Sequence, residues 1–145
     1  MPPLHDHRAV LRYLSDAART GALSPGAVLF LLGNEQGLPP VAVMIEDVPP
    51  SPPQHERVRL IAAMLSSLAE VGCSAFVVIV CRSGSALVTG DDLAWHDAAY
   101  GVRQPDAPAC QGVYVAARGR VLRVAPEAPG RPADEWSARP EAEAG

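Results

Sequence analysis

Residues 74–81 read Ser74-Ala-Phe-Val-Val-Ile-Val-Cys81, and in this run β-prone apolar residues follow one another without a polar interruption. A strand with one solvated face alternates apolar and polar residues, whereas a strand that is covered on both faces is apolar throughout. We therefore expect this stretch to form a central strand of a sheet, with further structure packed on each of its faces.

Three segments on either side of this strand have the periodicity of helices. Apolar residues recur at helical spacing within residues 5–20 and again within residues 58–69, and Gly21 and Gly72 follow these two runs where a helix would end. Residues 91–101 predict a third, shorter helix after the central strand.

Two pairs of β-prone runs complete the expected elements. Residues 27–32 and 41–48 are joined by a Gly-rich loop, and residues 111–117 and 120–125 are joined by Arg118-Gly119, so each pair reads as a hairpin. The predicted order is helix, strand, strand, helix, strand, helix, strand, strand. This order indicates an α/β (α+β) fold with a single mixed β-sheet flanked by helices. We expect one globular domain over residues 1–125 and a disordered tail rich in Pro, Ala and Glu over residues 126–145.

The composition excludes several classes of function. Of 145 residues, 48% are hydrophobic and 19% are charged, and the net charge is only -4, so neither nucleic-acid binding nor disorder of the whole chain is expected. No apolar run approaches the roughly 18 to 20 residues that a membrane span requires, so we expect no membrane association. The three cysteines are an odd number without a C-x-x-C pair, which favours a reducing, cytoplasmic setting. The chain has no lysine, which excludes Schiff-base chemistry on a lysine side chain.

The end of the central strand carries the motif with the most information. Residues 79–92 read I-V-C-R-S-G-S-A-L-V-T-G-D-D, which fits without a gap the spacing H-x-H-x(7)-S-x(2)-D. That spacing is the zinc signature of the JAB/MPN metalloproteases, and over residues 54–124 the chain resembles their RadC-like branch. The resemblance implies the JAB/MPN fold or the related cytidine-deaminase-like fold, with Asp92 as the carboxylate ligand and Glu35 or Glu46 as the glutamate of the family.

The two histidine positions of the signature hold Ile79 and Cys81, and isoleucine cannot bind a metal ion. We therefore expect no cofactor and no hydrolysis by the mechanism of this family. A rearranged metal site made of Cys81, Asp92 and His96 is an alternative, because Asp92 and His96 are spaced one turn apart on a helix. The spacing of Thr89 and Asp92 is also that of a capping box, which has a purely structural role.

Cys81 suggests a second chemistry. The segment Cys81-Arg82-Ser83-Gly84 resembles the active loop of rhodaneses, C-R-S-G-x-R, although Ala86 stands where the last arginine of that loop would be. This resemblance implies a sulfurtransferase or another thiol enzyme, in which Cys81 is the nucleophile and Arg82, Ser83 and Gly84 surround the sulfur. The alternative interpretation of Cys81 is a structural cysteine at the end of a strand.

These observations lead to two hypotheses of different classes. The first is a non-catalytic JAB/MPN-like module that binds another protein or a second copy of itself through a sheet edge or a helix face. The second is the small rhodanese-like enzyme. Trp136, in an otherwise polar tail, is a candidate docking residue. His5-Asp6-His7 resembles a metal-binding tripeptide, but near a terminus it is more often solvated or placed at a helix start.

Overall fold

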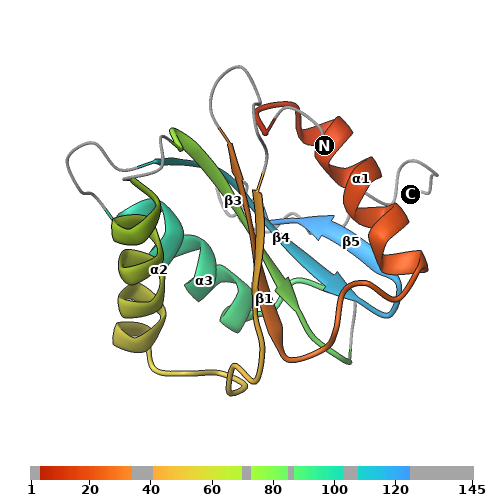
Figure 1. Cartoon of the computed structure of the whole chain (residues 1–145). Helices are drawn as coiled ribbons and strands as arrows, with labels where there is room; N and C mark the ends of the chain where they lie inside the picture. The colour runs from red at the N-terminus through yellow and green to blue at the C-terminus, as the bar shows by residue number, and fades with distance from the viewer. Residues whose placement is uncertain (1–3, 34–40, 70–72, 85–86, 103–107, 125–145) are drawn as a thin grey trace.

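The sheet of this protein contains five strands and is mixed. The structure is a computed structural model, and it describes residues 4–33, 41–69, 73–84, 87–102 and 108–124. The strands lie in the order β2-β1-β3-β4-β5 (Figure 1). The predicted α+β fold and its order of helices and strands are confirmed. In chain order the elements are α1 (His7–Arg19), β1 (Ala27–Gly33), β2 (Val41–Ile45), α2 (Gln54–Ala69), β3 (Ala75–Cys81), α3 (Gly90–Gly101), β4 (Ala109–Ala117) and β5 (Arg120–Arg123).

The apolar stretch that follows Ser74 forms β3 and lies at the centre of the sheet. It pairs antiparallel with β1 and parallel with β4, and each of its seven residues is buried. Parallel neighbours need a crossover connection, which α3 provides here between β3 and β4. The prediction of a strand covered on both faces is therefore correct.

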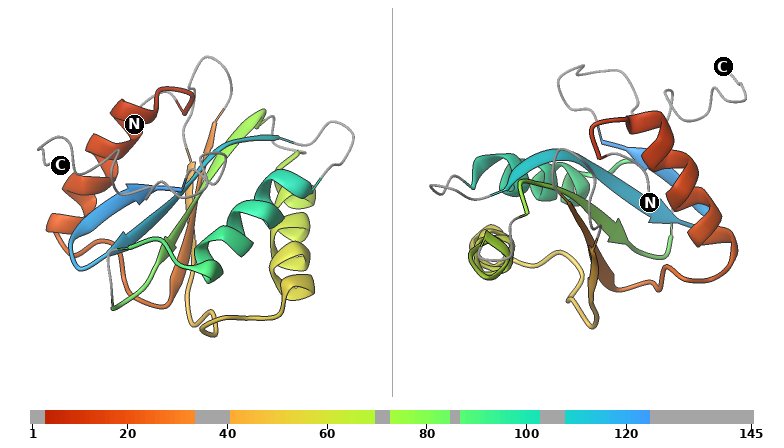
Figure 2. Two further views of the ribbon diagram at one scale, coloured as in Figure 1. Left: turned by 180° about the vertical axis from the view of Figure 1, so that it is seen from behind. Right: turned by 45° about the horizontal axis from the view of Figure 1, so that its top comes forward.

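Alternation along β3 divides the interior into two cores. Phe76, Val78 and Val80 pack with Ile61, Leu65, Trp95 and other residues, and we name this cluster the α2/α3 core. Val77, Ile79 and Cys81 pack with Val10 and Leu14, and we name that cluster the α1 core. Seen from the front and from behind, α1 lies on one face of the sheet and the two other helices lie on the opposite face (Figures 1 and 2). The side of the sheet on which a residue of β3 emerges thus decides which helices it can meet.

The helix boundaries follow from local hydrogen bonds. α1 begins at His7, two residues later than predicted, because the Asp6 side chain accepts a hydrogen bond from the Ala9 N–H and caps the helix. Val10 and Leu14, one turn apart, are the fully buried residues of its inner face. The helix predicted within residues 58–69 begins earlier, at Gln54, directly after the proline-rich break.

The strand ends differ from the prediction where the backbone departs from regular pairing. β2 ends at Ile45. Beyond it Asp47 has φ 61°, and the Val48 N–H donates to the Gly26 carbonyl at 2.9 Å, outside the regular pairing of β2 with β1. β4 begins earlier than predicted, and its register with β3 shifts after Phe76, which leaves Gln111 as the extra residue.

Some of the predictions fall on residues that the structure does not describe. These include the tail over residues 126–145 with Trp136, and Glu35 between the first two strands. Glu46 is described and lies exposed just beyond the end of β2. Within the described ranges, none of the helices is both long enough and apolar enough to cross a membrane.

Candidate functional site

Cys81 is the last residue of β3 and belongs to the α1 core. Its side chain is only 3% exposed, and burial raises the pKa of the thiol from 9.0 to about 11. The Cys81 carbonyl accepts a hydrogen bond from the Gly26 N–H at 2.9 Å, and the next N–H, that of Arg82, donates to the Ala116 carbonyl at 3.0 Å. The Cys81 carbonyl and the Arg82 N–H are therefore both hydrogen-bonded, one to the residue before β1 and the other to β4. A nucleophilic thiol must ionise near neutral pH, and burial of Cys81 opposes this.

Arg82 turns to the opposite side of the sheet and binds Asp92 of α3. The Arg82 Nη2 donates to Asp92 Oδ2 at 2.8 Å, and the Arg82 Nε donates to Asp92 Oδ1 at 3.2 Å, so the guanidinium and the carboxylate meet as two forks. The same Nη2 donates to the Leu87 carbonyl at 2.6 Å. Arg82 therefore ties the loop after β3 to the first turn of α3.

The beginning of α3 is the capping box that the sequence predicts. The Thr89 side chain accepts from the Asp92 N–H at 3.3 Å, and the Thr89 N–H donates to Asp92 Oδ2 at 2.8 Å. Asp92 is fully buried, and its carboxylate accepts three hydrogen bonds, two from Arg82 and one from the Thr89 N–H. The acceptor capacity of this carboxylate is used for structure.

The three candidate metal ligands do not converge. Cys81 points into the α1 core, whereas Asp92 lies on α3 at the opposite face of the sheet. The His96 ring lies beside Tyr100, with 4.4 Å between the ring centroids. Ile79 is fully buried in the α1 core, on the same side as Cys81. Among the described residues, no group of three or more His, Cys, Asp or Glu residues is placed to hold a metal ion.

The rhodanese-like segment also lacks the arrangement that its chemistry needs. The Arg82 guanidinium binds Asp92, and the Cys81 thiol lies on the other face of the sheet, where its Sγ is 4.0 Å from the Ile79 carbonyl oxygen. Ser83 and Gly84 are exposed, and Gly84 has φ 93°, where the chain turns away from the sheet. Ala86 lies outside the described residues. Cys81, Arg82, Ser83 and Gly84 are therefore not gathered around the sulfur.

Two polar contacts that sequence reasoning missed hold the helices in place. Arg57 of α2 is buried, forms an ion pair with Asp91, and lies over the Trp95 ring at 5.6 Å. Burial lowers the pKa of Arg57. The Arg57 Nη1 also donates to the Gln54 side chain at 2.9 Å. The helical period of α2 puts position 57 next to its apolar face. An arginine at such a position is the feature of the sequence from which a buried ion pair could have been predicted.

The second missed contact anchors α1 to the sheet. The His7 Nδ1 lies 2.8 Å from the Tyr114 hydroxyl, at the centre of β4. Tyr114 is fully buried, and burial raises the pKa of its hydroxyl. A Cβ atom at Gly112 would lie 3.1 Å from the Tyr114 ring, so the glycine leaves the space that the ring occupies. His7 is the first residue of α1 and is half-buried, so the expectation of a histidine at a helix start is correct and that of a solvated one is wrong.

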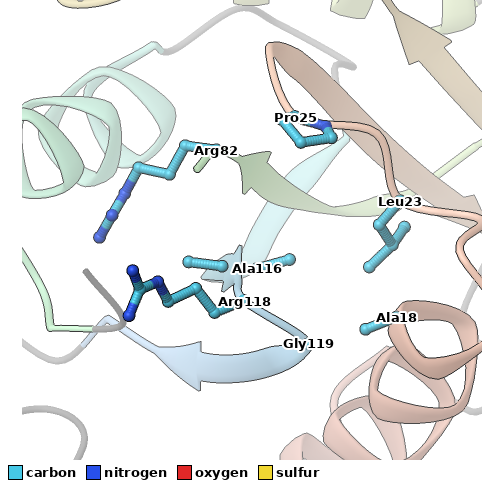
Figure 3. Close-up of a pocket in the computed structure, with 8 residues that line it drawn as sticks. Ala18, Leu23, Pro25, Arg82, Ala116, Arg118 and Gly119 are labelled. Atoms are coloured by element: carbon cyan, nitrogen blue, oxygen red, sulfur yellow. The ribbon is translucent and has the colours of Figure 1, made fainter. Parts of the chain in front are cut away.

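A pocket of about 120 Å³ lies beside the carboxyl ends of β3 and β4. Arg82 and Arg118 extend to the same side of it, whereas Ala18 and Leu23 lie on the other side (Figure 3). Arg118 and Gly119 were expected to join the last two strands, and they do form the turn between β4 and β5. In this turn Arg118 lines the pocket.

Comparisons with protein-family models, with curated proteins and with solved structures found no match to this chain.

Proposed function

We propose that this chain is a non-catalytic, JAB/MPN-like interaction or scaffolding module, which acts by binding protein. The observation that carries the proposal is the state of the two groups that would do chemistry. The Cys81 thiol is buried with its pKa raised to about 11, and the Asp92 carboxylate accepts three hydrogen bonds from Arg82 and the Thr89 N–H. Both groups are buried and stabilise the fold, so we place the function on the surface of the molecule.

The outer edge of β2 is the surface best suited to a protein partner. Within the described residues only β1 pairs with β2, so the other side of this strand presents backbone N–H and C=O groups. Ala42 is exposed, and Val43 and Ile45 are half-buried against the α2/α3 core. An extended segment of a partner can pair with such an edge and cover these apolar side chains. A second copy of the chain, paired through its own β2 about a two-fold axis, is the simplest partner.

Ala42→Lys tests this surface. A lysine on an exposed edge strand opposes pairing with another strand, and at this position it leaves the core untouched. We expect the wild-type chain to form a dimer in light scattering over a concentration series, and Ala42→Lys to be monomeric. Ala63→Lys is the matched control, because it places the same charge at an exposed position of α2 and should leave the dimer intact.

Two outcomes would contradict the β2 proposal. One is a wild-type chain that stays monomeric at every concentration, and the other is a dimer that Ala42→Lys and Ala63→Lys weaken equally. The rhodanese-like alternative is tested separately, by titrating the thiols with a disulfide reagent at neutral pH. A Cys81 that reacts faster than Cys73 would favour the enzyme, whereas the burial of Cys81 leads us to expect the reverse order.

We also infer a reducing, cytoplasmic setting. The three cysteines, Cys73, Cys81 and Cys110, are all free, which is the usual state of thiols in a reducing compartment.

A further inference from the structure

The pocket beside the carboxyl ends of β3 and β4 has two chemically different sides. Ala18, Leu23 and Pro25 form an apolar side, and Ala116 lies between this side and the two arginines (Figure 3). A pocket of about 120 Å³ has room for several water molecules or for a small organic molecule. Polar atoms contribute more of the pocket surface than apolar atoms do, which suits a charged ligand with only a short apolar part.

The two arginines of the pocket differ in their charge balance. Arg82 is bound by the Asp92 carboxylate, so this pair is neutral and the guanidinium is held in place. Arg118 is exposed, and within the described part of the chain no carboxylate forms an ion pair with it. The pocket therefore carries one uncompensated positive charge, at Arg118.

The backbone of Arg118 has a conformation that arginine does not favour. Arg118 and Gly119 connect β4 and β5 as a two-residue turn, with φ 54° and 75°. Such turns favour Asn, Asp or Gly at the first position, because a positive φ is unfavourable for most side chains. Arginine at this position is not the residue that best stabilises the turn. Strained positions of this kind cluster at ligand sites.

We propose that this pocket binds a small organic carboxylate. The carboxylate lies against the Arg118 guanidinium, which can donate two parallel hydrogen bonds to it, and the hydrocarbon part lies against Leu23 and Ala18. Arg82, held by Asp92, forms the wall beside Arg118 and keeps the loop after β3 in place. This site goes beyond protein binding at the edge of β2, because it requires neither that edge nor a partner.

Butyrate is a suitable probe, because it combines one carboxylate with a short apolar chain. It is titrated at constant ionic strength into ¹⁵N-labelled protein, and the amide signals of Gly119 and Ala116 and the arginine Nε–H signals are followed. We expect saturable shifts of these signals with butyrate. Butanol has the apolar chain without the charge and should bind about tenfold to a hundredfold more weakly, since a hydrogen bond to a charged group contributes about 1.5 to 3 kcal/mol.

Arg118→Asn separates binding from folding. Asparagine suits the positive φ of this turn, so the variant should unfold at the same temperature as the wild type or at a higher one. Its affinity for butyrate should fall by about tenfold to a hundredfold. Arg118→Lys keeps the charge without the planar fork and should lose less affinity. Arg120→Asn is the matched control, because it removes an exposed arginine from the same hairpin and should bind butyrate like the wild type.

Three results would overturn the proposal. The first is a shift that grows linearly with butyrate and equals the shift caused by sodium chloride. The second is an Arg118→Asn variant that binds butyrate as well as the wild type does. The third is an equal loss of affinity in Arg118→Asn and Arg120→Asn, which would show that only the general positive charge of the hairpin attracts the anion.

Discussion

Asp92 is the residue on which the loop after β3 and the start of α3 both depend. It is fully buried, and removal of its charge would leave the Arg82 guanidinium, itself 19% exposed, without its counter-charge. A partly buried cation that loses its partner retains its cost of desolvation. The ion pair thus makes Asp92 a structural residue, although the same position in the JAB/MPN signature would be a metal ligand.

We expect Asp92→Asn to lower the free energy of unfolding by about 2 to 3 kcal/mol, measured by urea denaturation. Asp97→Asn is the control, because Asp97 is exposed on the same helix and its substitution should change stability by less than about 0.5 kcal/mol. The double variant Asp92→Asn, Arg82→Gln should cost less than the sum of the two single variants, since the two side chains bind one another. Equal effects of Asp92→Asn and Asp97→Asn would contradict the structural role.

At the scale of elements, α3 depends on its cap. Thr89 accepts a hydrogen bond from the Asp92 N–H and donates its own N–H to the carboxylate, so two N–H groups at the start of the helix find partners. Tight packing at the other end is provided by Ala98 and Ala99, which lie buried against the sheet. The cap therefore holds the end of α3 that lies nearest to β3.

Thr89→Ala should lower the free energy of unfolding by about 1 kcal/mol, because it removes the side-chain acceptor of the cap. Thr20→Ala serves as the control. Thr20 is exposed beyond the end of α1, and its hydroxyl donates to the Ala17 carbonyl at 3.0 Å, so this variant should cost less. Thermal and urea denaturation of both variants would measure the difference. A Thr89→Ala variant as stable as the wild type would show that the cap contributes nothing.

The elements also show what could be predicted from sequence. The apolar run of β3 and the spacing of Thr89 and Asp92 are local patterns, and the central strand and the capping box follow from them. The end of β2 was predicted three residues late, because the pattern of apolar residues does not show that Asp47 has a positive φ. Secondary structure can thus be predicted from sequence where the residues of one segment determine it.

The candidate site was harder to predict, because it depends on how distant segments meet. Cys81 and Asp92 fit one motif by spacing, yet the crossover that places α3 on the face opposite to α1 separates them. The ion pair of Arg57 with Asp91 and the pocket at Arg118 join segments that lie far apart in the chain. A single sequence shows the residues of such contacts, but it does not show their pairing.

At the scale of the whole molecule, the interior keeps several weak acids in their neutral form. Burial raises the pKa of Cys81 and of Cys110 from 9.0 to about 11, and it raises the pKa of Tyr114 as well. Below pH 9 the folded and the unfolded chain both hold these protons, and the full stability is present. As the pH rises from 9 to 11, the unfolded chain releases protons that the folded chain retains. The free energy of unfolding should therefore fall across this window.

Cys81→Ala tests whether the buried Cys81 thiol contributes to this dependence of stability on pH. The shift from 9.0 to about 11 makes the Cys81 thiol responsible for a loss of roughly 2 kcal/mol between pH 9 and pH 11. Urea denaturation at a series of pH values, with reductant present, should show a flatter decline for Cys81→Ala than for the wild type. Cys73→Ala should change the slope less, because Cys73 is only partly buried. If both variants declined as steeply as the wild type, the burial of Cys81 would not be what keeps its thiol protonated, and the chemical argument against a reactive cysteine would fail with it.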